Sequence, residues 1–269
     1  MEIVDLSEFH QRLKLMMIEI HKICIDSGIN YTLMGGSLLG AFRHQGFIPW
    51  DDDMDIAMTY DNYKKFINIV NKNKHEWLEF DIPEYNDEYY SSFIKAYDNR
   101  TTFVENGRDK AKGIFIDIFP IVGAGDTMSE ALKEYKKHRF LKAVLQRKSY
   151  KMKTGFAREL IIRFVGLFFS RKYLVSSIYK HYDDLNKSHK QFSSDMDGTI
   201  RGIVESEIFG SFKLTKFEDT QFMVIEQADK YLTHVFGDYM RLPPKQKQKP
   251  HHIEYMDLNL PYSLYNKRQ

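Results

Sequence analysis

The sequence predicts an α+β protein with α/β-like features, in which a mixed-sheet core with flanking helices precedes a mostly helical C-terminal half. Up to residue 125, segments with apolar residues at helical spacing alternate with short strand-like segments. After residue 126 the pattern changes to long, basic segments with helical periodicity. Hydrophobic residues make up 43% and charged residues 28% of the 269 positions, which is typical of a folded globular chain. We therefore expect two parts, residues 1–125 and residues 126–269, with one continuous domain as the alternative.

Spacing and turn-forming residues define the elements of the first part. Ser7 to Ser27 repeats apolar residues at helical intervals, which predicts a helix with Ser7 as its N-cap and Gly28 just after its end. Gly35-Gly36 then separates a short strand from a short helix. In order, we expect a strand over 31–34, a helix over 37–44, a strand over 53–58, a helix over 61–72, and strands over 93–97, 101–105 and 113–119.

The second part is expected to contain helices over 128–153, 155–190 and 225–236. Ten Lys or Arg residues and one acid lie between Lys133 and Arg158, and the ten residues from Leu160 to Phe169 are apolar apart from Arg163. A bilayer span needs about 20 residues, so this segment is too short to cross a membrane, but it could lie in the interface. We expect peripheral contact with an anionic membrane, and a core helix with a solvated cationic face is the alternative.

Several classes of protein are excluded by composition. Cys24 is the single cysteine, so neither an intramolecular disulfide framework nor a cysteine-rich zinc ribbon can form. The N-terminus lacks the cationic and apolar regions of a signal peptide, and no apolar stretch is long enough for a membrane span. A net charge of +2 gives no sign of a nucleic-acid binder, in which cations usually dominate. We expect a cytoplasmic protein, with the inner face of the membrane as its peripheral location.

Paired carboxylates are the first sign of chemistry. Asp51, Asp53 and Asp55 would point the same way on a strand, roughly 6.5–7 Å apart in steps of two residues. Like charges this close repel one another, and a divalent cation removes that cost. Carboxylate oxygens favour Mg²⁺ or Mn²⁺ over softer metals. An EF-hand is excluded, because Ile56 and Asn62 stand where its loop needs Gly and Glu.

Two further features accompany these carboxylates. Gly35-Gly36-Ser37 lies between an expected strand and an expected helix, where backbone N–H groups can approach a phosphate, although a plain turn is the alternative. Asp117 stands alone in the apolar segment 113–119. An ionised carboxylate there is costly unless it is paired or bound to metal. It is therefore a candidate third metal ligand or general base, and the alternative is an edge-strand residue facing water.

The three features in this order resemble the nucleotidyltransferase superfold, with its Gly-Gly/Ser turn, Asp-apolar-Asp strand and later carboxylate strand. A narrower resemblance covers the chain from about residue 30 to about residue 255. The run RHQGFIPWDDD at 43–53 looks like the signature of the LicD-type phosphocholine transferases, a family that also includes fukutin-related proteins. GIFIDIFP at 113–120 and FGDYMRLPP at 236–244 agree with it in order.

The resemblance implies a nucleotidyltransferase-like core and transfer of a phosphorylated alcohol from a CDP-activated donor. The donor is usually CDP-choline, the acceptor is a hydroxyl of a lipid-linked or surface glycan such as a teichoic acid precursor, and CMP is released. Because phosphoryl transfer depends on positioning and charge neutralisation, we expect two Mg²⁺ or Mn²⁺ ions. Asp53 and Asp55 are expected to hold the first ion, and Asp51 is expected to be an outer ligand. Asp117 is expected to hold the second ion and to take the acceptor proton.

Five other residues are expected to bind substrate. The Gly36 backbone and Ser37 would hold a donor phosphate, and Arg43 and Lys95 would neutralise charge on the transferred or leaving group. His252 would close over the site from the C-terminal tail. Three alternatives remain: a nucleotidyltransferase with the same metal site, a glycosyltransferase that uses the Asp-x-Asp motif, and a non-catalytic glycan-binding protein.

Overall fold

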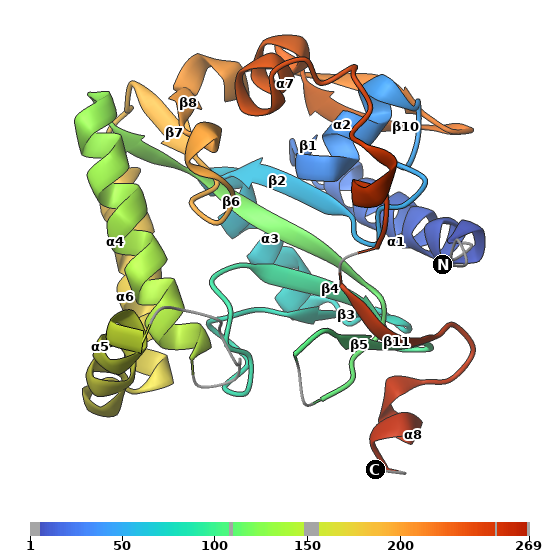
Figure 1. The fold of residues 1–269 in the computed structure, drawn as a ribbon, viewed down its shortest axis with the longest axis horizontal. Coiled ribbons are helices and arrows are strands. Elements are labelled where there is room, and N and C mark those ends of the chain that lie inside the picture. Colours follow the sequence, from blue (N-terminus) through green and yellow to red (C-terminus); the bar gives the residue numbers. More distant parts are fainter. Residues whose placement is uncertain (1–5, 108–109, 148–155, 251, 268–269) are drawn as a thin grey trace.

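A computed structural model of the chain describes residues 6–107, 110–147, 156–250 and 252–267. Its centre is a mixed sheet in the strand order β1-β2-β6-β4-β3 (Figure 1). β2 and β6 run parallel, and the other neighbours in this row are antiparallel. These strands are β1 (Thr32–Leu33), β2 (Asp55–Thr59), β3 (Leu78–Asp81), β4 (Ile94–Asp98) and β6 (Phe115–Gly125).

The long strand β6 organises the molecule. It lies between β2 and β4, and its far end continues into a pairing with β7 (Phe192–Ser194), which in turn pairs with β8 (Val204–Glu205). Almost all of its side chains are apolar and buried, as expected for a strand covered on both faces. Asp117 and Phe119 are its half-buried exceptions, and they share one face because side chains alternate along a strand.

Two N-terminal helices pack on the sheet. α1 (Ser7–Asp26) contacts β6, and α3 (Tyr60–Lys72) contacts β2 and β6 with the apolar face that the sequence predicts. α1 ends in a Schellman motif, since Gly28 has φ +60° and the N–H of Ile29 donates to the carbonyl of Cys24 at 2.8 Å. α2 (Gly35–Arg43) follows β1 directly and contacts β2.

The second part adds helices to one end of the sheet and a hairpin to the other. α4 (Met128–Gln146) and α6 (Arg171–Leu185) pack against β6 and each other, and α5 (Phe156–Phe168) packs on α4 (Figure 1). The hairpin β9 (Phe212–Phe217) and β10 (Thr220–Ile225) contacts α2 and β1. The remaining elements are η1 (Ile200–Gly202), η2 (Ser206–Phe209) and α7 (Ala228–Phe236).

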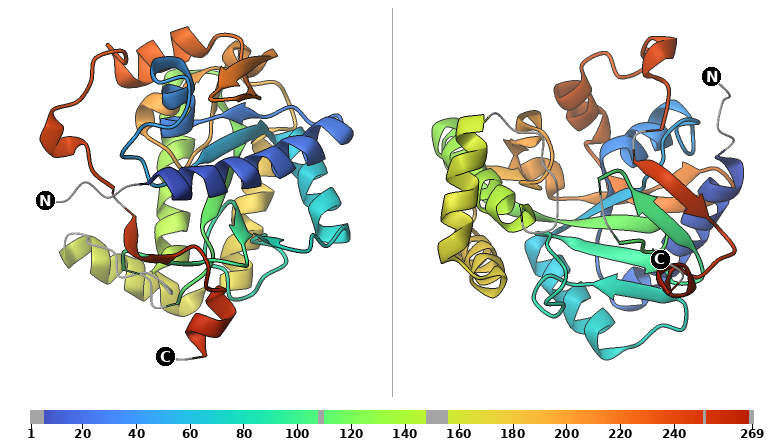
Figure 2. Two further views of the ribbon diagram at one scale, coloured as in Figure 1. Left: turned by 90° about the vertical axis from the view of Figure 1, so that its right-hand side faces the viewer. Right: turned by 60° about the horizontal axis from the view of Figure 1, so that its bottom comes forward.

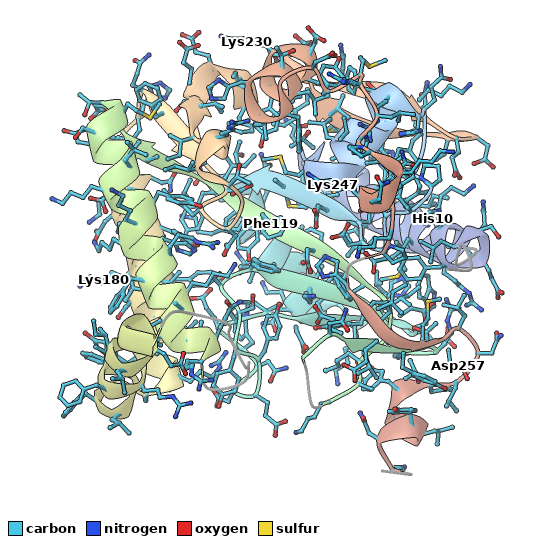
Figure 3. The ribbon with its side chains drawn as sticks, in the orientation of Figure 1. His10, Phe119, Lys180, Lys230, Lys247 and Asp257 are labelled. Carbon is cyan, nitrogen blue, oxygen red and sulfur yellow. The ribbon has the colours of Figure 1, made fainter. Side chains whose placement is uncertain are left out.

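The C-terminal tail crosses back to the N-terminal part. After η3 (Lys245–Lys247), β11 (Ile253–Asp257) pairs with β5 (Thr102–Glu105) in a separate two-stranded sheet, and α8 (Tyr262–Asn266) ends the described tail (Figure 2). Figure 3 labels Lys247, the last residue of η3, and Asp257, the last residue of β11. Buried apolar residues from both sides of position 125 form one contiguous cluster. Within the described ranges, no helix is long and apolar enough to cross a membrane.

Several sequence-based boundaries were wrong. Leu6, not Ser7, is the N-cap of α1. β2 begins at Asp55, because the preceding residues form a loop without strand pairing. The expected helix over 155–190 is two helices, since the chain leaves helical geometry at Ser170, which caps α6 by accepting from the N–H of Tyr173. The expected helix over 128–153 ends at Gln146, and residues 148–153 of that expectation lie outside the described residues.

Candidate active site

Three side chains that the sequence analysis singled out meet in one row across β2, β6 and β4. In the strand register Asp55 is opposite Asp117, and Asp117 is opposite Lys95. Neighbouring strands lie about 4.8 Å apart, so the two carboxylates are immediate neighbours. The reading of Asp117 as an edge-strand residue is wrong, because β6 is flanked on both sides.

Lys95 is buried and held on three sides. Its Nζ lies 3.1 Å from Glu105 Oε1 and 3.4 Å from Asp117 Oδ1, and it sits 3.3 Å from the centroid of the Phe115 ring. Only 2% of the residue is exposed, so its ammonium group is fixed next to the carboxylate row. A fixed cation of this kind can neutralise developing negative charge without reorganising.

The aspartates from Asp51 to Asp55 alternate in burial, although the strand β2 begins only at Asp55. Asp51, Asp53 and Asp55 are half-buried, whereas Asp52 is buried with 1% exposure. Burial, followed by repulsion from Asp53 and Asp52, raises the pKa of Asp51 to about 8. Burial and repulsion from Asp53, Asp117 and Asp51 likewise raise the pKa of Asp55 well above its usual value. Both shifts show that negative charge is crowded at this point.

The N-terminus of α2 faces these carboxylates. A Cβ atom on Gly36 would lie 2.2 Å from Asp51 Oδ2, and a Cβ atom on Gly35 would lie 2.8 Å from Asp55 Oδ2. The two glycines therefore let acidic side chains come close to the first turn of the helix. Ser37 Oγ accepts a hydrogen bond of 2.9 Å from the N–H of Asp55, so this hydroxyl also anchors the start of β2.

Arg43 lies farther from the row, at the last turn of α2. Its Nη1 donates to the carbonyl of Tyr239 at 3.1 Å, and its Nε donates to His44 at 3.0 Å. It therefore joins α2 to the segment that follows α7. Burial lowers the pKa of the Arg43 guanidinium, and the charge of Asp51 opposes this shift only in part.

The tail closes one side of the site. His252 Nε2 lies 3.3 Å from Asp53 Oδ2, and this contact raises the pKa of His252 to about 9. The buried Asp52 carboxylate accepts hydrogen bonds from the N–H groups of His252 at 2.7 Å and Ile253 at 3.0 Å. The structure thus brings His252 beside the aspartates, as the sequence suggested, and adds Asp52, whose role the sequence analysis missed. The alternation of residues in 51–56 could have indicated that Asp52 is buried, because it places Asp52 on the core side together with Met54 and Ile56.

The carboxylates do not form a complete metal site by themselves. Among the residues that the structure describes, no three His, Cys, Asp or Glu side chains are grouped closely enough to hold an ion. Mg²⁺, however, is usually bound by one or two carboxylates together with substrate phosphates and water. The oxygen-only donor set and the crowded charge at Asp51 and Asp55 fit such an ion.

Comparisons with known proteins identify relatives of this chain. A family model described as LicD/FKTN/FKRP, nucleotidyltransferase domain, matches residues 28–153. The lipopolysaccharide cholinephosphotransferase LicD of Haemophilus influenzae is 32% identical over 243 residues, which cover 87% of this chain and 91% of that protein. The human ribitol 5-phosphate transferase FKRP is 56% identical over 32 residues, which cover 12% of this chain and 6% of that protein.

Proposed function

Because the chain belongs to the LicD family, we propose that it moves a phosphorylated alcohol, phosphocholine from CDP-choline, onto a hydroxyl of a cell-surface glycan or teichoic acid precursor. The chain is a phosphotransferase enzyme of this family. The observation that carries the proposal is the row of Asp55, Asp117 and Lys95 on adjacent strands beside the N-terminus of α2. This row offers charge neutralisation and a proton acceptor at one point, which is what phosphoryl transfer requires.

The proposed cofactor is Mg²⁺ or Mn²⁺, with two ions. Asp53 and Asp55 would hold the first ion, Asp117 the second, and Asp51 would act as an outer ligand. Bound ions would polarise the phosphoryl oxygens and stabilise the charge that develops on the attacking and leaving oxygens. Support comes from the raised pKa values of Asp51 and Asp55, since burial and mutual repulsion disfavour their charged forms until a cation is present.

Residues of the chain would bind the donor phosphate, the transferred group and the leaving CMP. Backbone N–H groups in the first turn of α2, including that of Gly36, have no partner within the helix and can bind a donor phosphate. The Ser37 hydroxyl can donate to the same phosphate, because its oxygen already accepts from Asp55. Lys95 would neutralise the transferred group, and Arg43, at the far end of α2, would contact the CMP that leaves. His252 would cover the site from the tail.

The transfer step balances as follows. The acceptor hydroxyl oxygen forms a bond to the phosphorus that carries the alcohol, and the bond from this phosphorus to the bridging oxygen of the donor breaks. CMP leaves with that oxygen, and Asp117 takes the acceptor proton. Lys95 Nζ lies 3.4 Å from Asp117 Oδ1, so a fixed positive charge stands beside the group that would take the proton.

The test is CMP release from a panel of CDP-alcohols with Mg²⁺. We expect CMP from the native chain, and a loss on the order of 10²-fold or more in Asp55→Asn and Asp117→Asn. Asp61→Asn is the matched control, because its exposed carboxylate makes only a surface pair with Lys64. Full activity in Asp55→Asn or Asp117→Asn would overturn the proposed site.

The alternatives give different products in the same assay. A nucleotidyltransferase would release pyrophosphate from a nucleoside triphosphate, and a glycosyltransferase would consume a nucleotide sugar. A glycan-binding protein without activity would bind its ligand equally well with or without metal. Each outcome would replace the phosphotransfer proposed here.

We also propose that the enzyme contacts anionic lipid through α5, which would place it at the inner face of the cytoplasmic membrane. Phe164, Leu167 and Phe168 are 63%, 81% and 68% exposed on this helix. The stretch from Lys133 to Arg158, with its ten cations, supplies charge complementary to anionic headgroups. We expect flotation with phosphatidylglycerol vesicles at low salt, and loss of flotation in the double variant Phe164→Ser/Leu167→Ser. No flotation of the native chain would refute this part.

A further inference from the structure

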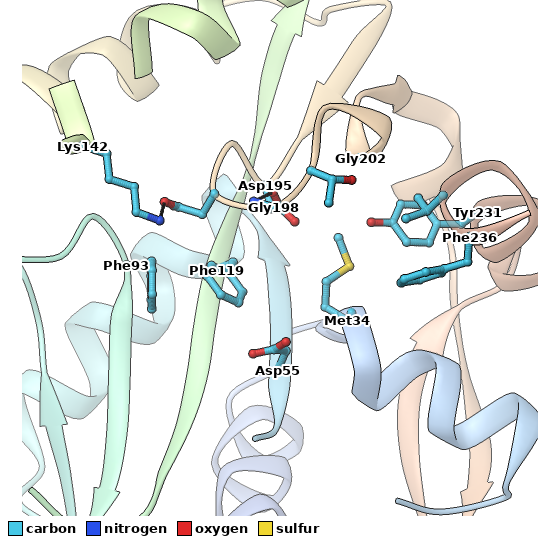
Figure 4. A pocket seen from close by; sticks show the side chains of 14 residues that line it. Met34, Asp55, Phe93, Phe119, Lys142, Asp195, Gly198, Gly202, Tyr231 and Phe236 are labelled. Atoms are coloured by element: carbon cyan, nitrogen blue, oxygen red, sulfur yellow. Dashed lines mark hydrogen bonds and ion pairs between the residues drawn. The ribbon is translucent and has the colours of Figure 1, made fainter. Parts of the chain in front are cut away.

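A small cavity opens beside Asp55, on the face of β6 that carries Phe119. Its volume is about 220 Å³, which is smaller than the roughly 300–1,000 Å³ of clefts for drug-sized ligands. It therefore suits one small group rather than a whole nucleotide. Its lining is mainly apolar, with rings from β6, the segment before β4, and α7 (Figure 4). The aromatic residues in the lining are Phe93, Phe119, Tyr231 and Phe236.

Two of these rings form a rigid wall. Phe93 and Phe119 have centroids 4.4 Å apart with an interplanar angle of 51°. Tyr231 enters from α7 and is 3% exposed, so it too is fixed. The cavity is therefore built before any ligand arrives.

The two aspartates of the loop that lines the cavity, Asp195 and Asp197, differ in how their charge is balanced. Lys142 Nζ lies 2.5 Å from Asp197 Oδ1, and His138 and Ser92 also contact that carboxylate, so Asp197 is neutralised from inside the protein. Asp195, by contrast, is 6% exposed and accepts from the N–H of Gly198 at 2.7 Å. Within the described part of the chain, no ion pair involves Asp195.

The backbone of the loop that carries Asp195 has an unusual conformation at Met196. Met196, between the two aspartates, is fully buried and has φ +59°, which an L-residue with a long side chain rarely adopts. Such strain persists only where the surroundings impose it. Burial raises the pKa of Asp195 to about 6, so the carboxylate is still charged at neutral pH.

We propose that this cavity binds the quaternary ammonium head of the transferred alcohol, with Phe93, Phe119 and Tyr231 against its methyl groups and Asp195 as its counter-ion. The assignment rests on the proposed function, since it requires the phosphate of the same group to lie at Asp55, which lines the cavity. Aromatic rings attract such a cation through their negative faces, and its methyl groups need no hydrogen bonds.

Other head groups fit the lining less well. A polyol such as glycerol or ribitol would bury hydroxyl groups against the Phe93 and Phe119 rings, which offer no hydrogen bonds, and this is costly. A primary ammonium group, as in ethanolamine, needs several acceptors. Of the three carboxylates in the lining, Asp197 is already paired with Lys142, which leaves Asp195 and Asp55. The cavity thus makes Phe119 and Asp195 specificity-determining residues.

The experiment compares three probes, phosphocholine, phosphoethanolamine and glycerol 3-phosphate, by calorimetry with the full chain, and turnover of the three matching CDP-alcohols. The test variants are Phe119→Leu and Asp195→Asn, of which the latter keeps an acceptor for the Gly198 N–H. Phe80→Leu is the matched control, because Phe80 is a half-buried ring of β3 that packs on Phe66 outside the cavity.

We expect the native chain to prefer phosphocholine over glycerol 3-phosphate. Phe119→Leu and Asp195→Asn should each weaken phosphocholine binding by roughly 5- to 30-fold, while CMP binding and the Phe80→Leu control remain unchanged. The same variants should lower kcat/KM for CDP-choline more than for CDP-glycerol.

The two proposals fail differently. CMP release from CDP-alcohols with no preference for choline, or with equal losses for all donors in both variants, would overturn the cavity assignment and leave phosphotransfer standing. Phosphocholine binding that depends on Phe119 and Asp195 without any CMP release would support the cavity and overturn the proposed reaction. Displacement of bound phosphocholine by cytidine alone would assign the cavity to the base instead.

Discussion

The buried Asp52 carboxylate is expected to hold the C-terminal tail in the active site. It accepts two backbone hydrogen bonds, from His252 at 2.7 Å and from Ile253 at 3.0 Å. Asp52→Ala removes both bonds and leaves two N–H groups to find water. Because the β5–β11 ladder from Ile253 to Asp257 remains, the expected change is local opening of the tail, not unfolding of the molecule.

The magnitude follows from the acceptor's charge. A hydrogen bond to a charged group contributes about 1.5–3 kcal/mol, so two such bonds contribute on the order of 3–6 kcal/mol to docking of the tail. At about 1.4 kcal/mol per factor of ten, the open fraction should rise by roughly 10²- to 10⁴-fold. Asp52→Asn keeps an acceptor without the charge, so its effect should be smaller.

Amide hydrogen exchange measured by mass spectrometry provides the assay. The peptide that contains His252 and Ile253 should exchange faster by the stated factor in Asp52→Ala, while peptides from α1 and β6 keep native rates. Asp53→Asn removes only the imidazole contact at 3.3 Å and should change exchange little. Unchanged exchange in Asp52→Ala would refute the reasoning that this carboxylate anchors the tail.

Three other predictions concern stability and reactivity. Gly113→Ala would place a Cβ atom 2.0 Å from the carbonyl oxygen of Asp98, which is backbone and cannot move aside; calorimetry should show a loss of about 2–4 kcal/mol and a melting temperature lower by roughly 5–10 °C. Burial raises the pKa of the Cys24 thiol well above its usual value, so a thiol reagent such as Ellman's reagent should react at least on the order of 10³-fold slower with the native chain than with the denatured one. Burial raises the pKa of Asp195 from 3.8 to about 6, so the stability linked to its protonated form is lost as pH rises through that range. Urea titrations should show that the unfolding free energy of Asp195→Asn, relative to that of the native chain, is higher at pH 8 than at pH 4 by on the order of 3 kcal/mol. A difference between the two chains that is the same at both pH values would contradict this.

The parts of the fold that local patterns control could be predicted from the sequence. The helical spacing in 7–27 and 61–72 and the apolar run around Asp117 gave the correct elements, because each buries one continuous apolar face or strand. The short strand β3 and the hairpin β9–β10 were missed. Half of the residues of β9 are exposed and only its last one, Phe217, is buried, so its strand form depends on pairing with β10.

The sequence predicted which residue types form the candidate site, but not all of the contacts between them. That Asp55 and Asp117 are neighbours depends on the parallel pairing of β2 with β6, which no local pattern encodes. Asp195 and the tail anchor at Asp52 were missed for the same reason. The two-residue period indicates that Asp52 is buried, but it does not indicate its partner, because His252 lies 200 positions away in the chain.

The five acidic side chains near α2 differ in how their charge is balanced, and this difference points to where a ligand must act. Asp52 is held by two amides, Asp53 by His252, and Asp117 by Lys95. Among the described residues, Asp51 and Asp55 form no ion pair, and burial and mutual repulsion raise the pKa of both. Burial and mutual repulsion disfavour the charged forms of these two half-buried carboxylates, and positive charge supplied beside them would stabilise those forms. Because Gly35 and Gly36 admit these two carboxylates to the helix end where we propose that the donor phosphate binds, that charge would arrive together with a phosphorylated substrate.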